Sequence, residues 1–310
     1  MSLPPADLDI INDTLRTRYW SWVFLEPKDT PGSLLDLFKT RLGHIAADTW
    51  EERFDFGGIY INGRPVLKDQ ILTSPCKIEY YEPKFEISQA SQVFPAFSED
   101  YIVYRDDYIL VAYKPAGLSS MPAKEQRHFS MKAHIEHLIG QTIHMPSRLD
   151  VSAQGLLITS ISDEAHAGLQ QAFERRLVKK EYRCATHAIL PWDELNVTAP
   201  IGRSKDHSVL RVIDYETGQS ANTIFSVLGS SKSDGKAVTV FSAKPITGRT
   251  HQIRVHAANS GAPLLGDRFY GGAAATSLHL VSFSITCLHP VTGAEINITL
   301  PEWLRAGWIL

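Results

Sequence analysis

The stretch that decides the fold class is residues 247–272, which read TGRTHQIRVHAANSGAPLLGDRFYGG. Gly248 permits a tight turn, and Thr250 carries a hydroxyl typical of a helix N-cap, so the pattern predicts a helix that begins at His251. Arg254 and a second arginine flank the positive end of that helix. A helix N-terminus with two guanidinium groups suits a phosphate or a buried carboxylate. The stretch therefore predicts an anion-binding turn.

Further toward the N-terminus, Asp150 is the first candidate for chemistry, in the stretch SRLDVSAQGLL. This stretch places a carboxylate beside Arg148 at the mouth of an apolar strand, GLLITSI. Taken alone, such a pair is more often an ordinary surface ion pair that contributes little. After the strand, Ser162 is a suitable N-cap for a helix that runs from Asp163 to about Arg176.

The remaining pattern is rich in strands. Short alternating or apolar runs predict strands over residues 101–104, 108–113, 179–188, 237–245, 278–286 and 296–300. We expect an α+β fold with a mixed, largely antiparallel sheet. The N-terminal third predicts a small separate α+β module, with a short helix in GSLLDLFKTRLG and a hairpin turn at Asn62-Gly63. A proline-containing linker gives domains 1–94 and 95–310.

Composition and charge bound the functional class. The chain has 310 residues, of which 44% are hydrophobic and 21% charged, as in a globular protein. No apolar run is long enough to span a bilayer and the N-terminus lacks a signal-peptide pattern, so we expect a cytoplasmic protein without membrane contact. The net charge is −3, and residues 1–100 hold 10 Lys and Arg against 16 Asp and Glu. This balance argues against a protein coated with basic residues.

Metal and disulfide chemistry are not indicated by the sequence. The three cysteines, Cys76, Cys184 and Cys287, are far apart, and we interpret them as buried thiols. His251 and His256 resemble a ligand pair, but residues five apart lie about 140° apart around a helix. No Cys or carboxylate spacing completes a site with them, so we expect no metal ion.

These stretches together resemble the RluA family of RNA pseudouridine synthases. Residues 247–272 are similar to the third signature segment of that family. SRLDVSAQGLL resembles its catalytic signature, H-R-L-D-x-x-T-S-G-L, with Ser147 in place of His and Ala153-Gln154 in place of Thr-Ser. ILVAYKPAGL, FERRLVKKEYRC and GQSANTIFSVL are similar to further family segments. The resemblance covers residues 100–305 and implies the pseudouridine synthase fold for the larger domain.

The resemblance implies a role for each matched residue. Asp150 is the expected catalytic nucleophile, and Arg254 is its expected buried cationic partner. Tyr182 is expected to stack on the base and to take part in removing the C5 proton. Arg148 is expected to occupy the space left by a flipped uridine. Four further positions are expected to bind substrate: Lys114, Lys180, Arg249 and Ile253.

Each of these residues also has a simpler interpretation. Lys114, Lys180 and Arg249 are each equally well explained by a solvated charged face. An aromatic at 182 is, by itself, more often a residue on the inner face of a strand. The N-terminal GGIYINGRPV resembles part of the S4-like RNA-binding domains, but the acidic balance of the module leaves a protein-contact or structural role as a serious alternative.

The implied activity is the isomerisation of specific uridines in structured RNA, either rRNA or tRNA, by a monomer. The reaction involves no redox change and no external group, so no cofactor is expected. Asp150 could attack C1′, assist formation of a glycal or add to the uracil ring, and all three routes remain open.

Two other functional classes compete with this one. The first is a noncatalytic RNA-binding or assembly factor that retains the fold, which the departures at 147 and 153–154 favour slightly. The second is a retaining glycosidase with Asp150 as nucleophile. A glycosidase needs a second carboxylate about 5–5.5 Å away, for which the sequence offers Glu181 or Asp267.

Overall fold

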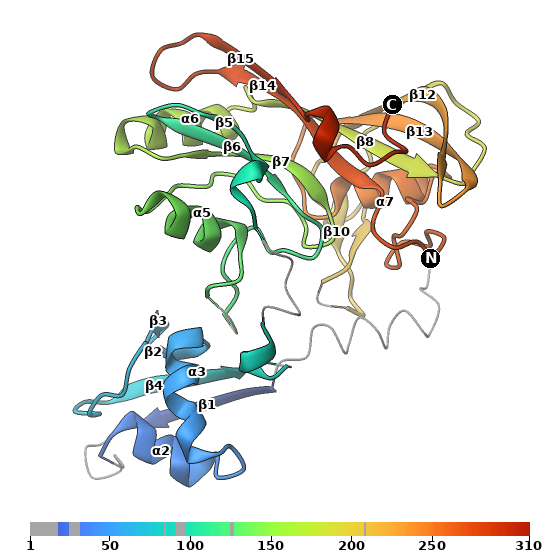
Figure 1. Cartoon of the computed structure of the whole chain (residues 1–310). Coiled ribbons are helices and arrows are strands. Elements are labelled where there is room, and N and C mark those ends of the chain that lie inside the picture. Colours follow the sequence, from blue (N-terminus) through green and yellow to red (C-terminus); the bar gives the residue numbers. More distant parts are fainter. Residues whose placement is uncertain (1–17, 25–31, 84, 91–96, 125–126, 208) are drawn as a thin grey trace. The chain divides into compact units, whose positions relative to one another are not determined.

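The chain forms two compact units in the computed structural model, which describes residues 18–24, 32–83, 85–90, 97–124, 127–207 and 209–310 (Figure 1). The larger unit contains residues 97–120 and 135–310, and the smaller unit contains the described residues before 91 together with segment 121–134. The sequence-based division had placed that segment in the larger domain. The Arg127 N–H donates to the Phe56 carbonyl at 2.9 Å, so the segment packs on the smaller unit.

The smaller unit is an antiparallel sheet of order β1-β4-β2-β3 with helices packed on it. Its elements are β1 (Arg18–Phe24), α2 (Leu34–Arg41), η2 (Ala47–Thr49), α3 (Trp50–Phe56), β2 (Ile59–Ile61), β3 (Arg64–Pro65), β4 (Cys76–Glu82) and η3 (Ile87–Gln89). Helix α2 lies in the predicted stretch, and Ser33 and Asp36 form a capping box at its start. Asn62 and Gly63, with φ of 50° and 75°, make the predicted hairpin turn.

The larger unit is built on a nine-stranded sheet of order β5-β6-β7-β14-β8-β13-β12-β9, in which β15 also pairs with β14. Its strands are β5 (Ile102–Arg105), β6 (Ile109–Lys114), β7 (Gln154–Ser160), β8 (Lys179–Thr186), β9 (Glu194–Val197), β12 (Thr223–Ser233), β13 (Lys236–Pro245), β14 (Leu280–Leu288) and β15 (Glu295–Thr299). Within the described sheet, every pairing except that of β7 with β14 is antiparallel. The predicted α+β fold with a largely antiparallel sheet is confirmed.

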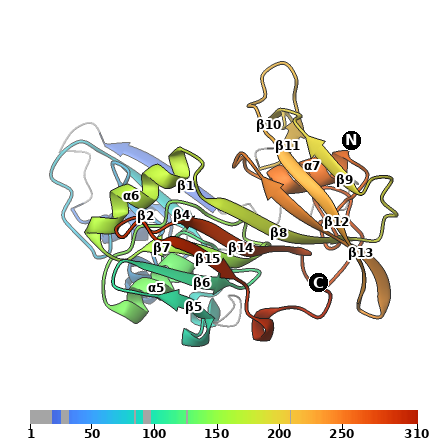
Figure 2. The same ribbon diagram turned by 90° about the horizontal axis from the view of Figure 1, so that it is seen from above.

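Helices lie at both ends of this sheet (Figures 1 and 2). The remaining elements are η4 (Glu99–Tyr101), α5 (Met131–Ile139), α6 (Asp163–Glu174), the hairpin of β10 (Ile201–Arg203) and β11 (Arg211–Ile213), α7 (Gln252–Asn259) and η5 (Glu302–Leu304). Helix α6 contacts β7, while α7 contacts β11, β12 and β13. The Ser162 hydroxyl accepts the Ala165 N–H, so α6 is capped as predicted.

The parallel pairing of β7 with β14 requires a glycine. Gly155 lies opposite Ser282 and has a φ of +111°. A Cβ at this position would overlap the backbone of Ser282, and L side chains rarely adopt this φ. Gly155 follows Asp150 by five residues, so it fixes how the chain leaves the Asp150 loop and enters the sheet.

Helix α7 begins one residue later than predicted, and Thr250 is not its cap. His251 occupies the N-cap position with the left-handed values φ 56° and ψ 17°, and its side chain makes no capping bond. Instead, Gln252 Oε1 accepts the Arg249 N–H at 3.0 Å and the Thr247 hydroxyl at 2.7 Å. The prediction that Thr250 caps the helix is wrong. The side chain of Gln252, the first residue of α7, accepts the hydrogen bonds at this turn instead.

Candidate active site

One row of paired residues crosses the sheet at the start of β7. Lys114 pairs with Gly155, Gly155 with Ser282, and Ser282 with Tyr182. Because neighbouring strands lie about 4.8 Å apart, the Cα atoms of Gly155 and Tyr182 lie roughly 10 Å apart. Asp150 lies in the loop that leads into β7. The row therefore brings Tyr182 to the part of the sheet from which the Asp150 loop extends.

Two carboxylates bind the same buried guanidinium, that of Arg254 on α7. Asp267 accepts two hydrogen bonds from it, at 2.8 Å from Nε and 2.7 Å from Nη2. Asp150 Oδ2 accepts one from Nη1 at 3.3 Å, so the ion pair predicted between Asp150 and Arg254 is present. The Asp267 side chain is 0% exposed, whereas that of Asp150 is 26% exposed. The bidentate bridge fixes the guanidinium plane and aims the remaining nitrogen at Asp150.

The surroundings of Arg254 keep it positively charged. Burial by itself lowers the pKa of Arg254, but its hydrogen bonds with Asp267 and the charges of Asp267 and Asp150 raise that pKa above its ordinary value. The ring centroids of Phe269 and Tyr270 lie 4.9 and 5.1 Å from the guanidinium carbon, a favourable arrangement for a cation. A permanent positive charge therefore lies beside Asp150.

The two carboxylate oxygens of Asp150 have different surroundings. Arg254 Nη1 and His251 Nε2 both approach Oδ2, at 3.3 and 3.8 Å. Within the described part of the chain, no hydrogen bond reaches Oδ1, and a quarter of the side chain is exposed. The arrangement holds one oxygen in place and leaves the other accessible, as a carboxylate nucleophile requires.

His251 connects Asp150 to a hydrogen-bond chain. Its Nδ1 lies 2.7 Å from the Tyr270 hydroxyl oxygen, which also accepts the backbone N–H of Arg211 at 3.0 Å. Burial, followed by the charge of Arg254, lowers the pKa of His251 to about 4. Burial raises the pKa of Tyr270 to about 12. Both groups are therefore neutral near pH 7.

Lys114, which was predicted to bind an RNA phosphate, makes its contacts inside the protein. Its side chain is completely buried, and Nζ donates to the carbonyls of Pro115, Leu118 and Val151 at 2.9, 2.7 and 3.2 Å. Burial lowers the pKa of Lys114 to about 7, against the opposing effect of the Asp150 charge. With all three donors used inside the protein, Lys114 ties the loop after β6 to the residue that follows Asp150.

The other cations predicted to contact substrate have different settings. Arg148 is exposed, and its guanidinium has no partner among the described residues. Arg249 is partly exposed, and its Nε donates to the Ser220 carbonyl at 3.1 Å. Lys180 Nζ lies 5.5 Å from the centroid of the Phe173 ring. Of these three cations, Arg148 is the one whose charged group bonds to no other described residue, so its whole guanidinium is available to RNA.

Two predicted residues are apolar or aromatic and buried. Tyr182 lies on β8 and Ile253 lies in the first turn of α7, and both are nearly inaccessible to solvent. Ile253 directly precedes Arg254. Both positions lie on elements that form the site, and the roles assigned to them remain predictions.

Sequence reasoning missed the partners of Arg254 and His251. It considered Asp267 only as a glycosidase carboxylate, although Asp267 is the bidentate partner of Arg254. It assigned no role to Tyr270 or Gln252. The one available signal was chemical: a buried arginine needs a buried carboxylate, and Asp267 lies in the same stretch, 247–272, as Arg254.

The described residues were also compared with what a metal site or a membrane-spanning helix requires. These residues contain no group of three or more His, Cys, Asp or Glu side chains placed to hold a metal ion. His256 bonds instead to Thr223 and to the Ala199 carbonyl. The three cysteines are free and buried, as predicted. Among the described helices, none has the length and apolar character needed to cross a bilayer.

Comparisons with known proteins point to one family. A family model described as RNA pseudouridylate synthase matches residues 108–259. The chain is 30% identical over 252 residues to YhcT of Bacillus subtilis, which is named an uncharacterized RNA pseudouridine synthase, covering 78% of this chain and 81% of that protein. It is 31% identical to RluA of Escherichia coli K12, named a dual-specificity RNA pseudouridine synthase, covering 64% of this chain and 92% of that protein.

A solved structure with a similar fold carries a related description. The structure of human RNA pseudouridylate synthase domain containing 1 matches with a TM-score of 0.57 and 24% identity, over 67% of this chain and 87% of that chain. That likeness shows the fold, and the two bacterial relatives show the family because most of their length is covered at 30% identity or more. The chain belongs to the RluA family of RNA pseudouridine synthases.

Proposed function

We propose that this chain converts specific uridines to pseudouridine in structured RNA, with Asp150 as the nucleophile. The observation that carries the proposal is the asymmetric environment of Asp150, whose Oδ2 faces Arg254 while Oδ1 is open. In the reaction the N1–C1′ bond breaks, the uracil turns, C5 bonds to C1′, C5 loses a proton and N1 gains one. No atom is gained or lost overall, so a carboxylate and a proton acceptor suffice.

Asp150 can begin this sequence in three ways. It can attack C1′, assist loss of the 2′ proton to form a glycal, or add to the uracil ring. Each route requires an ionised carboxylate in a partly enclosed site, where desolvation disfavours the charge. The buried positive charge of Arg254, 3.3 Å from Oδ2, supplies the compensation that all three routes need.

Tyr182 and Arg148 have separate roles in this proposal. Tyr182 stacks on the uracil and its hydroxyl accepts the C5 proton directly or through water. Its support is the pairing row that links Gly155, at the start of β7, with Tyr182 through Ser282. Arg148 fills the space left by the flipped uridine, supported by its exposure and by its position two residues from Asp150.

The geometry opposes the glycosidase alternative. Asp267 is buried in two hydrogen bonds with Arg254, so it is not free to donate a proton. Glu181 is paired with Arg183 and with Lys244. Burial favours a raised pKa for Glu181, but these partners outweigh it and lower that pKa. A glycosidase acid requires the opposite, a raised pKa.

Two of the departures from the family signature, Ala153 and Gln154, make contacts away from the Asp150 carboxylate. The Ala153 N–H donates to the Asp150 backbone carbonyl at 3.1 Å, a bond that any side chain at 153 permits. Gln154 Oε1 accepts the Tyr113 hydroxyl at 2.7 Å, so its amide is engaged within the sheet. With Ala153 and Gln154 in place, the Asp150 carboxylate keeps Arg254 as its partner, which favours the catalytic function over the noncatalytic alternative.

The proposed substrates are rRNA and tRNA, and the proposed setting is the cytoplasm, with the chain acting as a monomer and without a cofactor. The relatives named RluA are described as dual-specificity enzymes, so the test must include more than one class of RNA. The S4-like resemblance of the N-terminal module supports RNA contact by that unit as well.

Pseudouridine mapping by carbodiimide treatment tests the function. RNA is compared from source cells with the gene, without it, and complemented with wild type, Asp150→Ala or the exposed control Asp107→Ala. We expect sites that are lost on deletion and restored by wild type and Asp107→Ala only. Purified Asp150→Ala should still bind the RNA. Restoration by Asp150→Ala contradicts the nucleophile assignment, and the absence of any lost site favours the noncatalytic alternative.

A further inference from the structure

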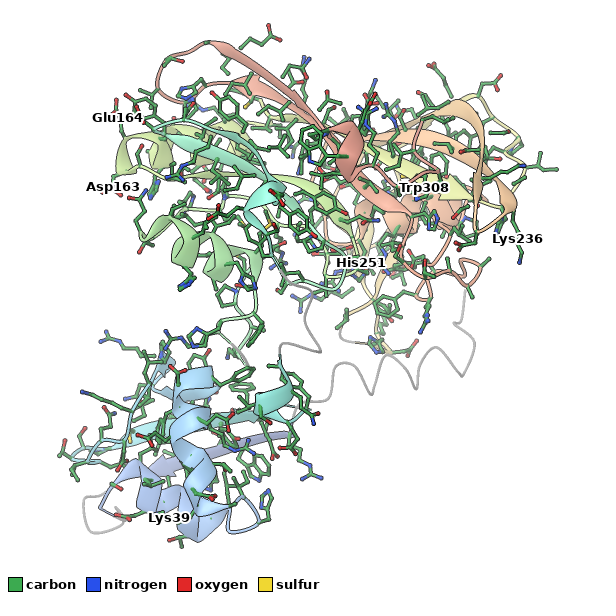
Figure 3. All side chains as sticks on the ribbon, viewed as in Figure 1. Lys39, Asp163, Glu164, Lys236, His251 and Trp308 are labelled. Carbon is green, nitrogen blue, oxygen red and sulfur yellow. The ribbon has the colours of Figure 1, made fainter. Side chains whose placement is uncertain are left out.

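His251 lies between Asp150 and Tyr270 in the candidate active site. It is the N-cap residue of helix α7 and is labelled in Figure 3. Its two ring nitrogens face different partners: Nδ1 lies 2.7 Å from the Tyr270 hydroxyl and Nε2 lies 3.8 Å from Asp150 Oδ2. A buried imidazole with one nitrogen directed at a nucleophile is poised to control that nucleophile.

The neighbours of the His251 ring favour one of its two neutral tautomers. The Tyr270 oxygen accepts the Arg211 N–H, and its own proton can satisfy His251 Nδ1 when the imidazole carries its hydrogen on Nε2. A neutral imidazole has one N–H, and the opposite tautomer would turn the Nε2 lone pair toward Asp150 Oδ2, so the arrangement favours the hydrogen on Nε2. The lowered pKa of His251, about 4, agrees with a neutral ring. Nε2 therefore presents a hydrogen, and not a lone pair, to the carboxylate.

We propose that His251 is a positioning residue that restrains Asp150 Oδ2 through its Nε2–H, in the tautomer set by Tyr270. This inference rests on the proposed function of Asp150. A separation of 3.8 Å is longer than a hydrogen bond, so the proposed restraint requires this contact to shorten when substrate binds, as catalytic contacts commonly do. Together with Arg254, His251 holds Oδ2 from two directions and leaves Oδ1 directed at the substrate.

A neutral donor has a particular advantage at this place. The charged groups around the ring are Arg254 and Arg211, which oppose a positive His251, and Asp150 and Asp267, which favour one. A neutral Nε2–H can stabilise Asp150 as a carboxylate and can remain in place when Asp150 becomes a neutral ester, because it carries no charge that loses its partner. The chain also couples Asp150 to β11 through the Arg211 backbone.

The backbone at His251 determines which variants are informative. Its φ of 56° lies in the left-handed region, which glycine adopts without strain. His251→Gly therefore deletes the ring while retaining the turn. Tyr270→Phe removes only the hydroxyl that sets the tautomer. Asp234→Gly is a matched control, since Asp234 is exposed, has a φ of 49° and lies in the β12–β13 hairpin.

Single-turnover rates test the proposal. They are measured on an RNA identified by the mapping experiment, at saturating RNA, across pH, and with and without added imidazole. We expect His251→Gly to lose roughly 100-fold and Tyr270→Phe roughly 10-fold, the range of positioning effects, with RNA affinity changed less than about threefold. Added imidazole should restore His251→Gly increasingly as pH rises and the free imidazole becomes neutral. Asp234→Gly should react as wild type does.

The possible results separate the two proposals. A His251→Gly rate within about twofold of wild type overturns the positioning role. So does a slow His251→Gly that imidazole does not restore at any pH, because that outcome assigns the ring a structural role only. Failure of the proposed function is recognised differently: wild type then forms no pseudouridine, or Asp150→Asn forms it as fast as wild type in the same assay.

Discussion

Asp150 lies between two regions that are built in opposite ways. On one side, Arg254 on α7 and its N-cap residue His251 are buried and bonded to Asp267 and Tyr270. On the other side, residues 147–153 form a loop in which Arg148 is exposed and unpaired among described residues. The comparison teaches that the electrostatics of the site are set before RNA arrives, whereas its recognition side is left open.

The largest effect on stability should come from breaking the buried side. Asp267→Asn leaves the Arg254 guanidinium buried without its bidentate partner, and loss of one member of a buried pair costs about 3–5 kcal/mol. Asp150→Asn removes one longer, partly exposed contact and should cost less than about 1 kcal/mol. Urea unfolding followed by far-UV circular dichroism measures both free energies of unfolding.

The exposed carboxylate variant Asp107→Asn calibrates this comparison, because it changes the same charge away from the site. If Asp267→Asn unfolds at the same urea concentration as Asp150→Asn, the two carboxylates contribute alike. The division into a buried, prepared side and an open side then fails.

The sequence predicted the parts of this comparison that short segments encode. Asp150 and Arg254 each lie within an ordered motif, so their register followed from the chain alone, and their ion pair is present. The Ser162 cap of α6 and the Asn62-Gly63 hairpin also depend on neighbours only a few residues away. Local chemistry is sufficient for such features, because the residues that decide them are adjacent.

The features that the sequence did not predict depend on contacts between distant segments. Lys114 reads as a surface cation, but its strand end turns inward and its ammonium meets the Val151 carbonyl, 37 positions away. Thr250 satisfies the preference for an N-cap, yet His251 takes the left-handed position that starts α7. The partner of Arg254 was hidden for the same reason: Asp267 follows it by 13 residues, outside the helix that carries it.

The buried side should also produce a pH effect on stability. The pKa of His251 is about 4 in the folded protein against an ordinary value of 6.5, so between these pH values the unfolded chain binds more protons. The free energy of unfolding should therefore fall as pH falls through this window, by up to about 1.4 kcal/mol per pH unit. Above pH 6.5 this contribution is constant.

Urea unfolding of wild type and His251→Gly at a series of pH values from 7 to 4 isolates this contribution. The difference in the free energy of unfolding between the two proteins should shrink steadily as pH falls, because the variant has no imidazole at this site to protonate. A difference that stays constant across the series would mean that His251 titrates alike in the folded and unfolded chains, and the buried side would lose its distinctive feature.

The open side should show the smallest effect on stability and a selective effect on activity. Arg148→Ala should change the free energy of unfolding by less than about 0.5 kcal/mol, since the side chain is exposed and has no partner among the described residues. Flipping a uridine out of a helix costs a few kcal/mol, and a residue that fills the vacated space offsets part of that cost. Arg148→Ala should therefore lower the rate of modification of folded RNA and leave the rate on a short unstructured strand unchanged.

Modification rates measure this selectivity. Wild type, Arg148→Ala and Arg105→Ala are each assayed on a folded target and on an unstructured oligonucleotide with the same uridine. Arg105 is another exposed arginine, on β5, so it controls for the loss of one positive charge. We expect only Arg148→Ala to slow the folded target, by roughly tenfold. Equal slowing of both RNAs would assign Arg148 to phosphate binding, because a phosphate contact is made whether or not the base must be flipped.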